Sequence, residues 1–277
     1  MIPFDFEYHR PDTVGEAIEA FNRLDSGNKS PVYYGGGTEL ITMARVGNLS
    51  FGSVIDIKSI PDCKRLEYDN DSLILGSALS LSDIVESNCF PLLTRTAGRI
   101  ADHTSQRSIT LGGNLSSTII YRETVLPLLL TDASITVASP MGLKGCGISE
   151  LFNGRLNLNR GEFVVSVSIN KPYLDAPYFH QKKTKNEKID YPLLTTAGLK
   201  TNGRIRIAFS GLASCPFRNS DVESIINDNA YDFNQRAEKA AEAISSVILD
   251  DISGSAEYRK FVLNETLVNI LETMKDL

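Results

Sequence analysis

Two glycine-rich clusters constrain the fold of this sequence more than any other feature. The first is Tyr34-Gly35-Gly36-Gly37-Thr38-Glu39, which follows the β-prone run Pro31–Tyr34, and the second is Thr110-Leu111-Gly112-Gly113-Asn114-Leu115. Glycine lets the backbone turn tightly and approach a ligand closely. Successive N–H groups in such turns form a nest that suits a phosphate. The pair therefore indicates either two ordinary tight turns or two nests that hold the two phosphates of a dinucleotide.

The spacing of these glycines matches neither common nucleotide-binding motif. The sequence has no G-x-G-x-x-G that opens a helix and no G-x-x-x-x-G-K-[ST], so neither a Rossmann domain nor a P-loop is expected. It also lacks G-x-S-x-G and H-E-x-x-H, the signatures of two large hydrolase classes. The sequence therefore predicts no catalytic side chain. The residues alone indicate a soluble α+β protein, with two ordinary turns and the binding of a phosphorylated ligand as the open alternatives.

Charge and composition exclude several other classes. The net charge of −6 and the short basic run at 182–185 argue against a nucleic-acid partner. No stretch reaches the roughly 18 apolar residues of a membrane span, and the acidic start lacks a secretory signal. We therefore expect a cytoplasmic protein.

The cysteines and histidines predict no metal site on this chain. Four cysteines, at positions 63, 89, 146 and 215, show no metal-ligand or redox spacing, and three histidines are scattered. Free thiols in a reducing compartment are the expected state. The chain consequently has no ligand set for an iron–sulfur cluster of its own.

Hydrophobic patterns predict a mixed α+β chain. A capping box at Thr13–Glu16 begins a helix near 13–25, and a hairpin is expected at 66–75. Prolines and charges after residue 172 predict a linker or long loop that extends to 190. Beyond it, Asn202-Gly203 favours a type I′ hairpin. Two helices, near 233–249 and 255–275, close the chain.

Taken together, the two clusters resemble those of the FAD-binding, medium subunits of the xanthine dehydrogenase and carbon monoxide dehydrogenase family. That family has an A-G-G-T-[DE]-L-like loop and a later T-[IL]-G-G-N-L loop. Between the clusters, Val54–Pro61 is similar to its "VDLSRIPEL" stretch, and after the second cluster Leu126–Ala133 is similar to its "LPALLALDA" stretch. Near the end, Gly254–Arg259 is similar to its "RGSAEYR" segment. The resemblance thus covers nearly the whole chain in order.

The resemblance implies an FAD-binding fold of the p-cresol methylhydroxylase, or vanillyl-alcohol oxidase, type. It predicts an FAD-binding domain over 1–172, with subdomains of about 1–57 and 58–172, and a smaller C-terminal α+β domain over 173–277. FAD is expected on this chain. Molybdopterin is expected on a large partner subunit, and [2Fe-2S] clusters are expected on a small one.

The resemblance also assigns cofactor-binding residues. The two clusters are expected to hold the pyrophosphate and neighbouring sugar groups, Ile100 and Ala101 to line the adenine or flavin pocket, and Val165 and Lys182 to lie near the cofactor. The full set is Tyr33, Tyr34, Gly35, Gly36, Gly37, Thr38, Glu39, Leu40, Ile100, Ala101, Thr110, Leu111, Gly112, Gly113, Asn114, Glu123, Val165 and Lys182. For Lys182, a plain surface lysine is the alternative.

One segment departs from the family pattern. Before Leu126 the family reads roughly "NAxPxxD", whereas this chain has Ser117-Thr118-Ile119-Ile120-Tyr121-Arg122-Glu123. Glu123 replaces the usual aspartate, so its carboxylate lies one methylene further from the backbone. The polar contacts around FAD are therefore expected to differ from the family pattern.

The function implied by the resemblance is electron transfer within an oxidoreductase complex. The chain would accept electrons from iron–sulfur clusters on a partner and reduce NAD. The substrate would be chosen on the molybdenum subunit, and a purine is our first expectation, with nicotinate, other heterocycles, aldehydes and carbon monoxide as alternatives. Two other functions remain open. One is a free-standing flavoprotein oxidase, and the other is a binding or maturation module that has lost FAD.

Overall fold

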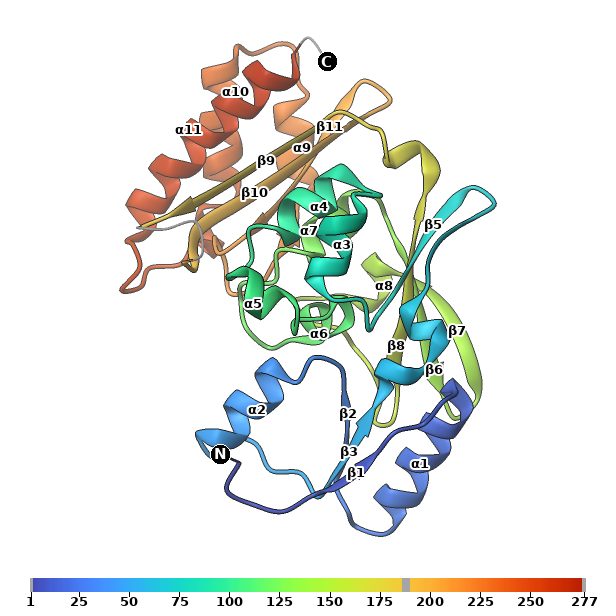
Figure 1. Cartoon of the computed structure of the whole chain (residues 1–277). Coiled ribbons are helices and arrows are strands. Elements are labelled where there is room, and N and C mark those ends of the chain that lie inside the picture. The colour runs from blue at the N-terminus through green and yellow to red at the C-terminus, as the bar shows by residue number, and fades with distance from the viewer. Residues whose placement is uncertain (1, 186–189, 276–277) are drawn as a thin grey trace. The chain divides into compact units, whose positions relative to one another are not determined.

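The computed structural model describes residues 2–185 and 190–275 (Figure 1). The chain forms two compact units. The first comprises Met1–Ser87, His103–Ser117 and Ala133–Asn170, and the second comprises Asn88–Asp102, Thr118–Asp132 and Lys171–Leu277. The second unit thus includes two segments from the first half of the chain. The division into continuous domains at residue 172 stays a prediction.

A small parallel sheet of the first unit carries the first glycine cluster. Its strand order is β1-β3-β2, formed by Glu7–His9, Ser53–Asp56 and Pro31–Tyr34. Side chains of a strand alternate between its faces. Tyr33 and Ile55 therefore pack on α1 (Val14–Ser26), while Val32 and Val54 pack beside Ala44 of α2 (Thr38–Arg45), so a helix covers each face (Figure 1).

The other sheet of the first unit is antiparallel, in the order β4-β5-β8-β6-β7. Its strands are Leu66–Asp69, Ser72–Gly76, Phe163–Asn170, Ser134–Ser139 and Gly142–Gly147. The remaining helices of the unit are the 3₁₀ helices η1 (Ile57–Ser59) and η2 (Pro61–Lys64), α3 (Leu81–Ser87), α5 (His103–Gln106), α6 (Leu111–Ser116) and α8 (Ile148–Leu151). Phe163 and Val165 of β8 join the core beneath α1.

The second unit is built on the antiparallel sheet β12-β11-β10-β9. Its strands are Phe217–Arg218, Arg204–Ser210, Pro192–Thr201 and Tyr178–Thr184. Its helices are α4 (Pro91–Ala97), α7 (Val125–Leu130), η3 (Lys171–Tyr173), α9 (Ser220–Ile226), α10 (Phe233–Ala243), η4 (Ser245–Val247) and α11 (Ala256–Met274). Helices α9, α10 and α11 lie on one side of the sheet, and α4 and α7 lie on the other (Figure 1).

Several predicted elements are confirmed. Helix α1 begins after Thr13, whose hydroxyl accepts the Glu16 N–H, although the Glu16 carboxylate accepts from Asp12 rather than closing the box on Thr13. The 66–75 hairpin forms as β4 and β5. Asn202 and Gly203 join β10 to β11 with φ of 51° and 73°, as the type I′ turn requires.

The predicted linker is wrong, and two helices were not predicted. The linker expected after residue 172 contains strand β9, because Phe179 is buried in the core and Lys182 is neutralised inside the protein by an acid distant in sequence. Part of that predicted loop, 186–189, lies outside the described residues. The sequence also gave no sign of α2 and α6, which begin within the glycine clusters, since two or three glycines in succession disfavour a helix.

Candidate cofactor site

The first glycine cluster leads into the N-terminus of helix α2. Gly37 is the N-cap of α2 with φ 71°, and no side chain caps the helix. Among the described residues, the structure records no protein acceptor for the N–H groups of Gly36, Gly37, Thr38 and Leu40. A helix N-terminus with free N–H groups carries partial positive charge and attracts a phosphate. This cluster therefore fits the pyrophosphate that the sequence predicts for it.

Glycine is required in the first cluster by the protein's own packing. A Cβ atom at Gly36 would lie 1.6 Å from the carbonyl oxygen of Ser108, and one at Gly35 would lie 2.7 Å from Oγ1 of Thr110. At Gly37, a Cβ atom would lie 2.2 Å from the ring of Tyr34. The structure thus brings the two clusters together in the first unit, with the backbone of one pressed against the segment that leads into the other.

The second cluster uses its own N–H groups internally. Leu111 N donates to Leu79 O, and Gly112 N donates to Ser77 O. Gly113 N donates to the hydroxyl of Thr110, and Asn114 N donates to the carbonyl oxygen of Thr110. These four N–H groups are therefore not free to bind a phosphate, contrary to the interpretation of this cluster as a phosphate-binding nest. The second cluster supports the first, and its contacts with the cofactor stay a prediction.

A polar network of Lys58, Asp56 and Tyr8 contacts the first cluster at the carbonyl oxygen of Gly35. Lys58 Nζ donates to the Gly35 carbonyl oxygen at 2.9 Å and to both Asp56 carboxylate oxygens at 2.8 Å. Tyr8 OH donates to the same carboxylate at 2.5 Å. Burial raises the pKa of Asp56, but the hydrogen bonds from Lys58 and Tyr8 outweigh it and hold that pKa below its ordinary value. Sequence reasoning missed Lys58, although it lies in the Val54–Pro61 stretch that resembles the family.

Two of the predicted cofactor residues lie in the core of the first unit. The ring of Tyr33 packs against Phe21 and Phe163, and its hydroxyl donates to Gly161 O at 2.9 Å. Burial raises the pKa of Tyr33. Val165 is 3% exposed in the same core. Tyr34 instead lies at the cluster, with Lys58 Nζ 4.2 Å above the centre of its ring.

In the second unit, Glu123 and Lys182 form a buried ion pair. Their nearest charged atoms are 3.3 Å apart, and each side chain is 3% exposed. Lys182 Nζ also donates to the Arg99 carbonyl oxygen at 2.7 Å. Burial raises the pKa of Glu123, and the ammonium of Lys182 opposes that rise without cancelling it. The structure therefore contradicts the alternative of a plain surface lysine.

The remaining predicted residues of the second unit follow Arg99 directly. Ile100 is 8% exposed, and Ala101 adopts a left-handed conformation with φ 51°. Because Lys182 binds the Arg99 carbonyl oxygen, the ion pair anchors the turn that carries both residues. The structure thus brings together the predicted residues Ile100, Ala101, Glu123 and Lys182.

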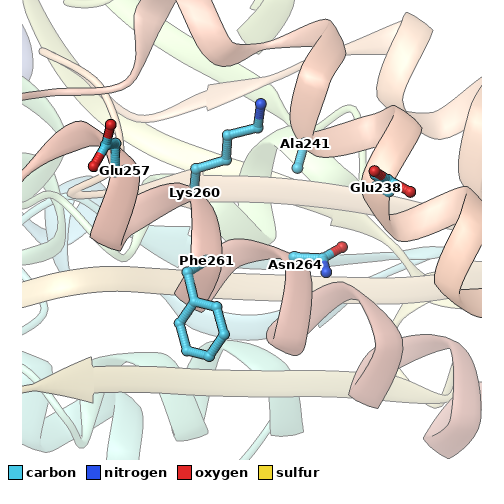
Figure 2. A pocket seen from close by; sticks show the side chains of 6 residues that line it. All are labelled: Glu238, Ala241, Glu257, Lys260, Phe261 and Asn264. Atoms are coloured by element: carbon cyan, nitrogen blue, oxygen red, sulfur yellow. The ribbon is translucent and has the colours of Figure 1, made fainter.

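A surface hollow between α10 and α11 is separate from all the predicted residues. It is lined by Glu238, Ala241, Glu257, Lys260, Phe261 and Asn264 (Figure 2). The side chains of Lys260 and Phe261 point in opposite directions there. In the described part of the chain, no group of three or more acids, cysteines or histidines could hold a metal ion. No helix among those residues is long and apolar enough to cross a membrane.

Comparison with known proteins defines first the fold and then the family. The fold is that of carbon monoxide dehydrogenase from Hydrogenophaga pseudoflava, with a TM-score of 0.87, 23% identity and coverage of 99% of this chain and 98% of that chain. The likeness extends to a quinoline 2-oxidoreductase chain from Pseudomonas putida 86, with a TM-score of 0.84. This is the mixed helix-and-sheet fold of molybdenum-hydroxylase medium subunits, of the p-cresol methylhydroxylase type, as the resemblance implied.

Sequence comparisons agree with the structural ones. The xanthine dehydrogenase FAD-binding subunit of Escherichia coli O157:H7 is 24% identical, over 98% of this chain and 94% of the relative. The nicotine 6-hydroxylase medium subunit of Paenarthrobacter nicotinovorans is 28% identical, over 94% of both. Residues 4–172 match the model of the FAD binding domain in molybdopterin dehydrogenase. The chain belongs to this family, and it is the FAD-binding subunit of an oxidoreductase.

Proposed function

We propose that this chain transfers electrons within a molybdenum-hydroxylase complex, from [2Fe-2S] clusters on a small subunit to NAD. A molybdopterin-binding large subunit would oxidise the substrate. The proposal is supported by the family of the chain and by one observation above all. The first glycine cluster packs closely against Ser108 and Thr110, and at the start of α2 its N–H groups have no recorded acceptor in the described part of the chain. Bound FAD would supply the two-electron redox chemistry.

The chain's own residues would bind and orient the cofactor. The N–H groups of Gly36, Gly37 and Thr38 would hold the pyrophosphate at the positive end of α2. Within the second unit, Lys182 anchors the turn that carries Ile100 and Ala101, and these two residues stay predicted contacts of a cofactor ring. No side-chain acid or base is assigned, since the protein's part in such chemistry is to bind, orient and tune the cofactor.

The substrate of the complex stays open, although a purine is our first proposal. Relatives of similar identity are named after xanthine, carbon monoxide, glyceraldehyde and nicotine, and all cover more than nine tenths of this chain. Because so many substrates are served by one type of FAD subunit, the large subunit must choose among them. Co-purification with that subunit, followed by assays with NAD and xanthine, would test the assignment of acceptor and substrate.

FAD binding at the start of α2 can be tested with Thr38→Asp. Thr38 is exposed, and its side chain makes no recorded hydrogen bond, so the substitution removes no contact. A carboxylate in the first turn stabilises a helix by about 0.3–1 kcal/mol, but it repels the pyrophosphate. We expect the purified wild-type chain to bind FAD, with absorption near ~375 and ~450 nm. The Thr38→Asp protein should remain folded and bind at least about tenfold more weakly.

Thr38→Asn is the matched control, because it is similar in size and uncharged. It should bind FAD nearly as tightly as the wild type, as measured by quenching of flavin fluorescence. Equal affinity for the Asp and Asn variants would place the pyrophosphate elsewhere. A colourless wild-type chain that fails to take up added FAD would favour the non-catalytic module.

A further inference from the structure

Lys58 contacts the first glycine cluster at one defined atom. Its ammonium donates to the carbonyl oxygen of Gly35 at 2.9 Å. The peptide between Gly35 and Gly36 is trans. In a planar trans peptide, the C=O and N–H groups point in opposite directions. Because Lys58 holds the Gly35 carbonyl oxygen on one side, the Gly36 N–H must point away from Lys58.

The Gly36 N–H is one of the groups without a recorded protein acceptor in the described chain. Lys58 therefore fixes the direction of an N–H group that is free to bind a ligand. Without this contact, the Gly35–Gly36 peptide could rotate, since the glycine residues on both sides of it tolerate a wide range of φ and ψ. A rotated peptide would present its carbonyl oxygen, which repels a phosphate, where the N–H now lies.

The position of Lys58 is itself held on three sides. Both oxygens of Asp56 accept its ammonium at 2.8 Å, and Tyr8 from β1 donates to Asp56. The ring of Tyr34 lies beneath the ammonium, 4.2 Å from ring centre to Nζ. The Asp56 side chain is 7% exposed and the Lys58 side chain 39%. Asp56 neutralises the charge of Lys58, so attraction of a phosphate by that charge is weak and the main effect is orientation.

We propose that Lys58 is a positioning residue for the cofactor's pyrophosphate, which orients the Gly36 N–H through the Gly35 carbonyl oxygen. The inference rests on the proposed FAD site at the start of α2 and adds the residue that shapes it.

The test compares FAD affinity and the phosphorus environment in variants of the whole chain. The variants are Lys58→Met, which removes the donor, Lys58→Arg, which keeps one, and the exposed control Lys64→Met. Apoprotein is titrated with FAD by fluorescence, and ³¹P NMR spectra are recorded for the complexes. We expect Lys58→Met to raise Kd by about ten- to a hundredfold and to shift the pyrophosphate resonances. Lys58→Arg should recover most of the affinity, and Lys64→Met should match the wild type.

The experiment distinguishes failure of the proposed FAD site from failure of the role of Lys58. A wild-type chain that binds no FAD overturns the proposed site and the role of Lys58 with it. A wild-type chain that binds FAD, together with a Lys58→Met variant of equal Kd and unchanged ³¹P shifts, overturns the role of Lys58 alone. If the Met variant does not fold, Lys58→Gln keeps a polar group at this position but is too short to reach Gly35. A wild-type Kd for that variant also overturns the inference.

Discussion

At the scale of single residues, the structure buries a charged side chain that the sequence alone would place on the surface. Lys182 belongs to a basic run that is typical of a solvated loop, yet its side chain is 3% exposed and paired with Glu123. Removing one partner of a buried pair typically destabilises a protein by about 3–5 kcal/mol. The glutamate that departs from the family pattern is therefore a structural residue of the second unit. Whether it also contacts FAD stays a prediction.

His180 gives a residue-scale prediction about pH. It lies partly buried on β9, and burial of the imidazole together with the charges of Arg95, Arg99 and Lys182 lowers its pKa from 6.5 to about 4. Between these values the unfolded chain binds a proton that the folded chain does not, so the free energy of unfolding falls as the pH falls. Near pH 4 this loss reaches about 3 kcal/mol, since each pKa unit corresponds to about 1.4 kcal/mol.

The measurement is urea unfolding of the wild type and of His180→Gln from pH 7 to pH 4. Below about pH 6.5, the wild type should lose stability relative to the variant, because glutamine does not titrate. His103→Gln, at an exposed position, is the control and should follow the wild type. Parallel curves for the wild type and His180→Gln would show that His180 has a similar pKa in the folded and unfolded states.

At the scale of elements, replacing glycine by alanine should have opposite effects on stability in the segments that begin α2 and α1. At Gly36 an added Cβ atom would overlap the Ser108 carbonyl oxygen, which belongs to backbone and cannot turn aside. At Gly15, in the first turn of α1, the nearest atom is Thr13 Oγ1 at 4.0 Å. We expect Gly36→Ala to destabilise the protein by at least about 2 kcal/mol and Gly15→Ala to stabilise it by up to about 1 kcal/mol.

Thermal and urea unfolding measure both changes. The prediction also means that bulky residues at Gly36 remove FAD by distorting the two clusters, so they are a poor test of the site itself. A Gly36→Ala protein as stable as the wild type would show that the clusters do not press together as the structure has them.

At the scale of the whole chain, the second unit depends on segments from the first half of the sequence. Helix α7 packs against β10, β11 and β12, and its residues are buried. Arg206 and Arg218 both pair with Asp132, at the end of the same segment. A fragment of residues 173–277 would lack all of these contacts and expose the apolar face that α7 covers.

We therefore expect the 173–277 fragment to show no cooperative thermal transition by circular dichroism. Co-expression with a 1–172 fragment should restore it, because the missing segments are then supplied. A cooperative transition in the isolated fragment would support the independent C-terminal domain that the sequence predicts.

The sequence by itself determined two things: the secondary-structure elements that depend on neighbouring residues, and the family of the chain. The 202–203 turn, the apolar face of α11 and the capped start of α1 depend on neighbouring residues, so they were predictable. The glycine clusters identified the family because their order along the chain is specific. FAD, the fold class and the oxidoreductase role followed from that resemblance.

Only the tertiary structure decided how the site is built. Lys58 meets Gly35 across 23 positions of sequence, and Lys182 meets Arg99 across 83. No local pattern encodes such contacts, because they depend on which strands and segments lie side by side. The same holds for the second glycine cluster, whose N–H groups looked free in the sequence. They are bound by Ser77, Leu79 and Thr110, since buried donors in a folded protein find acceptors.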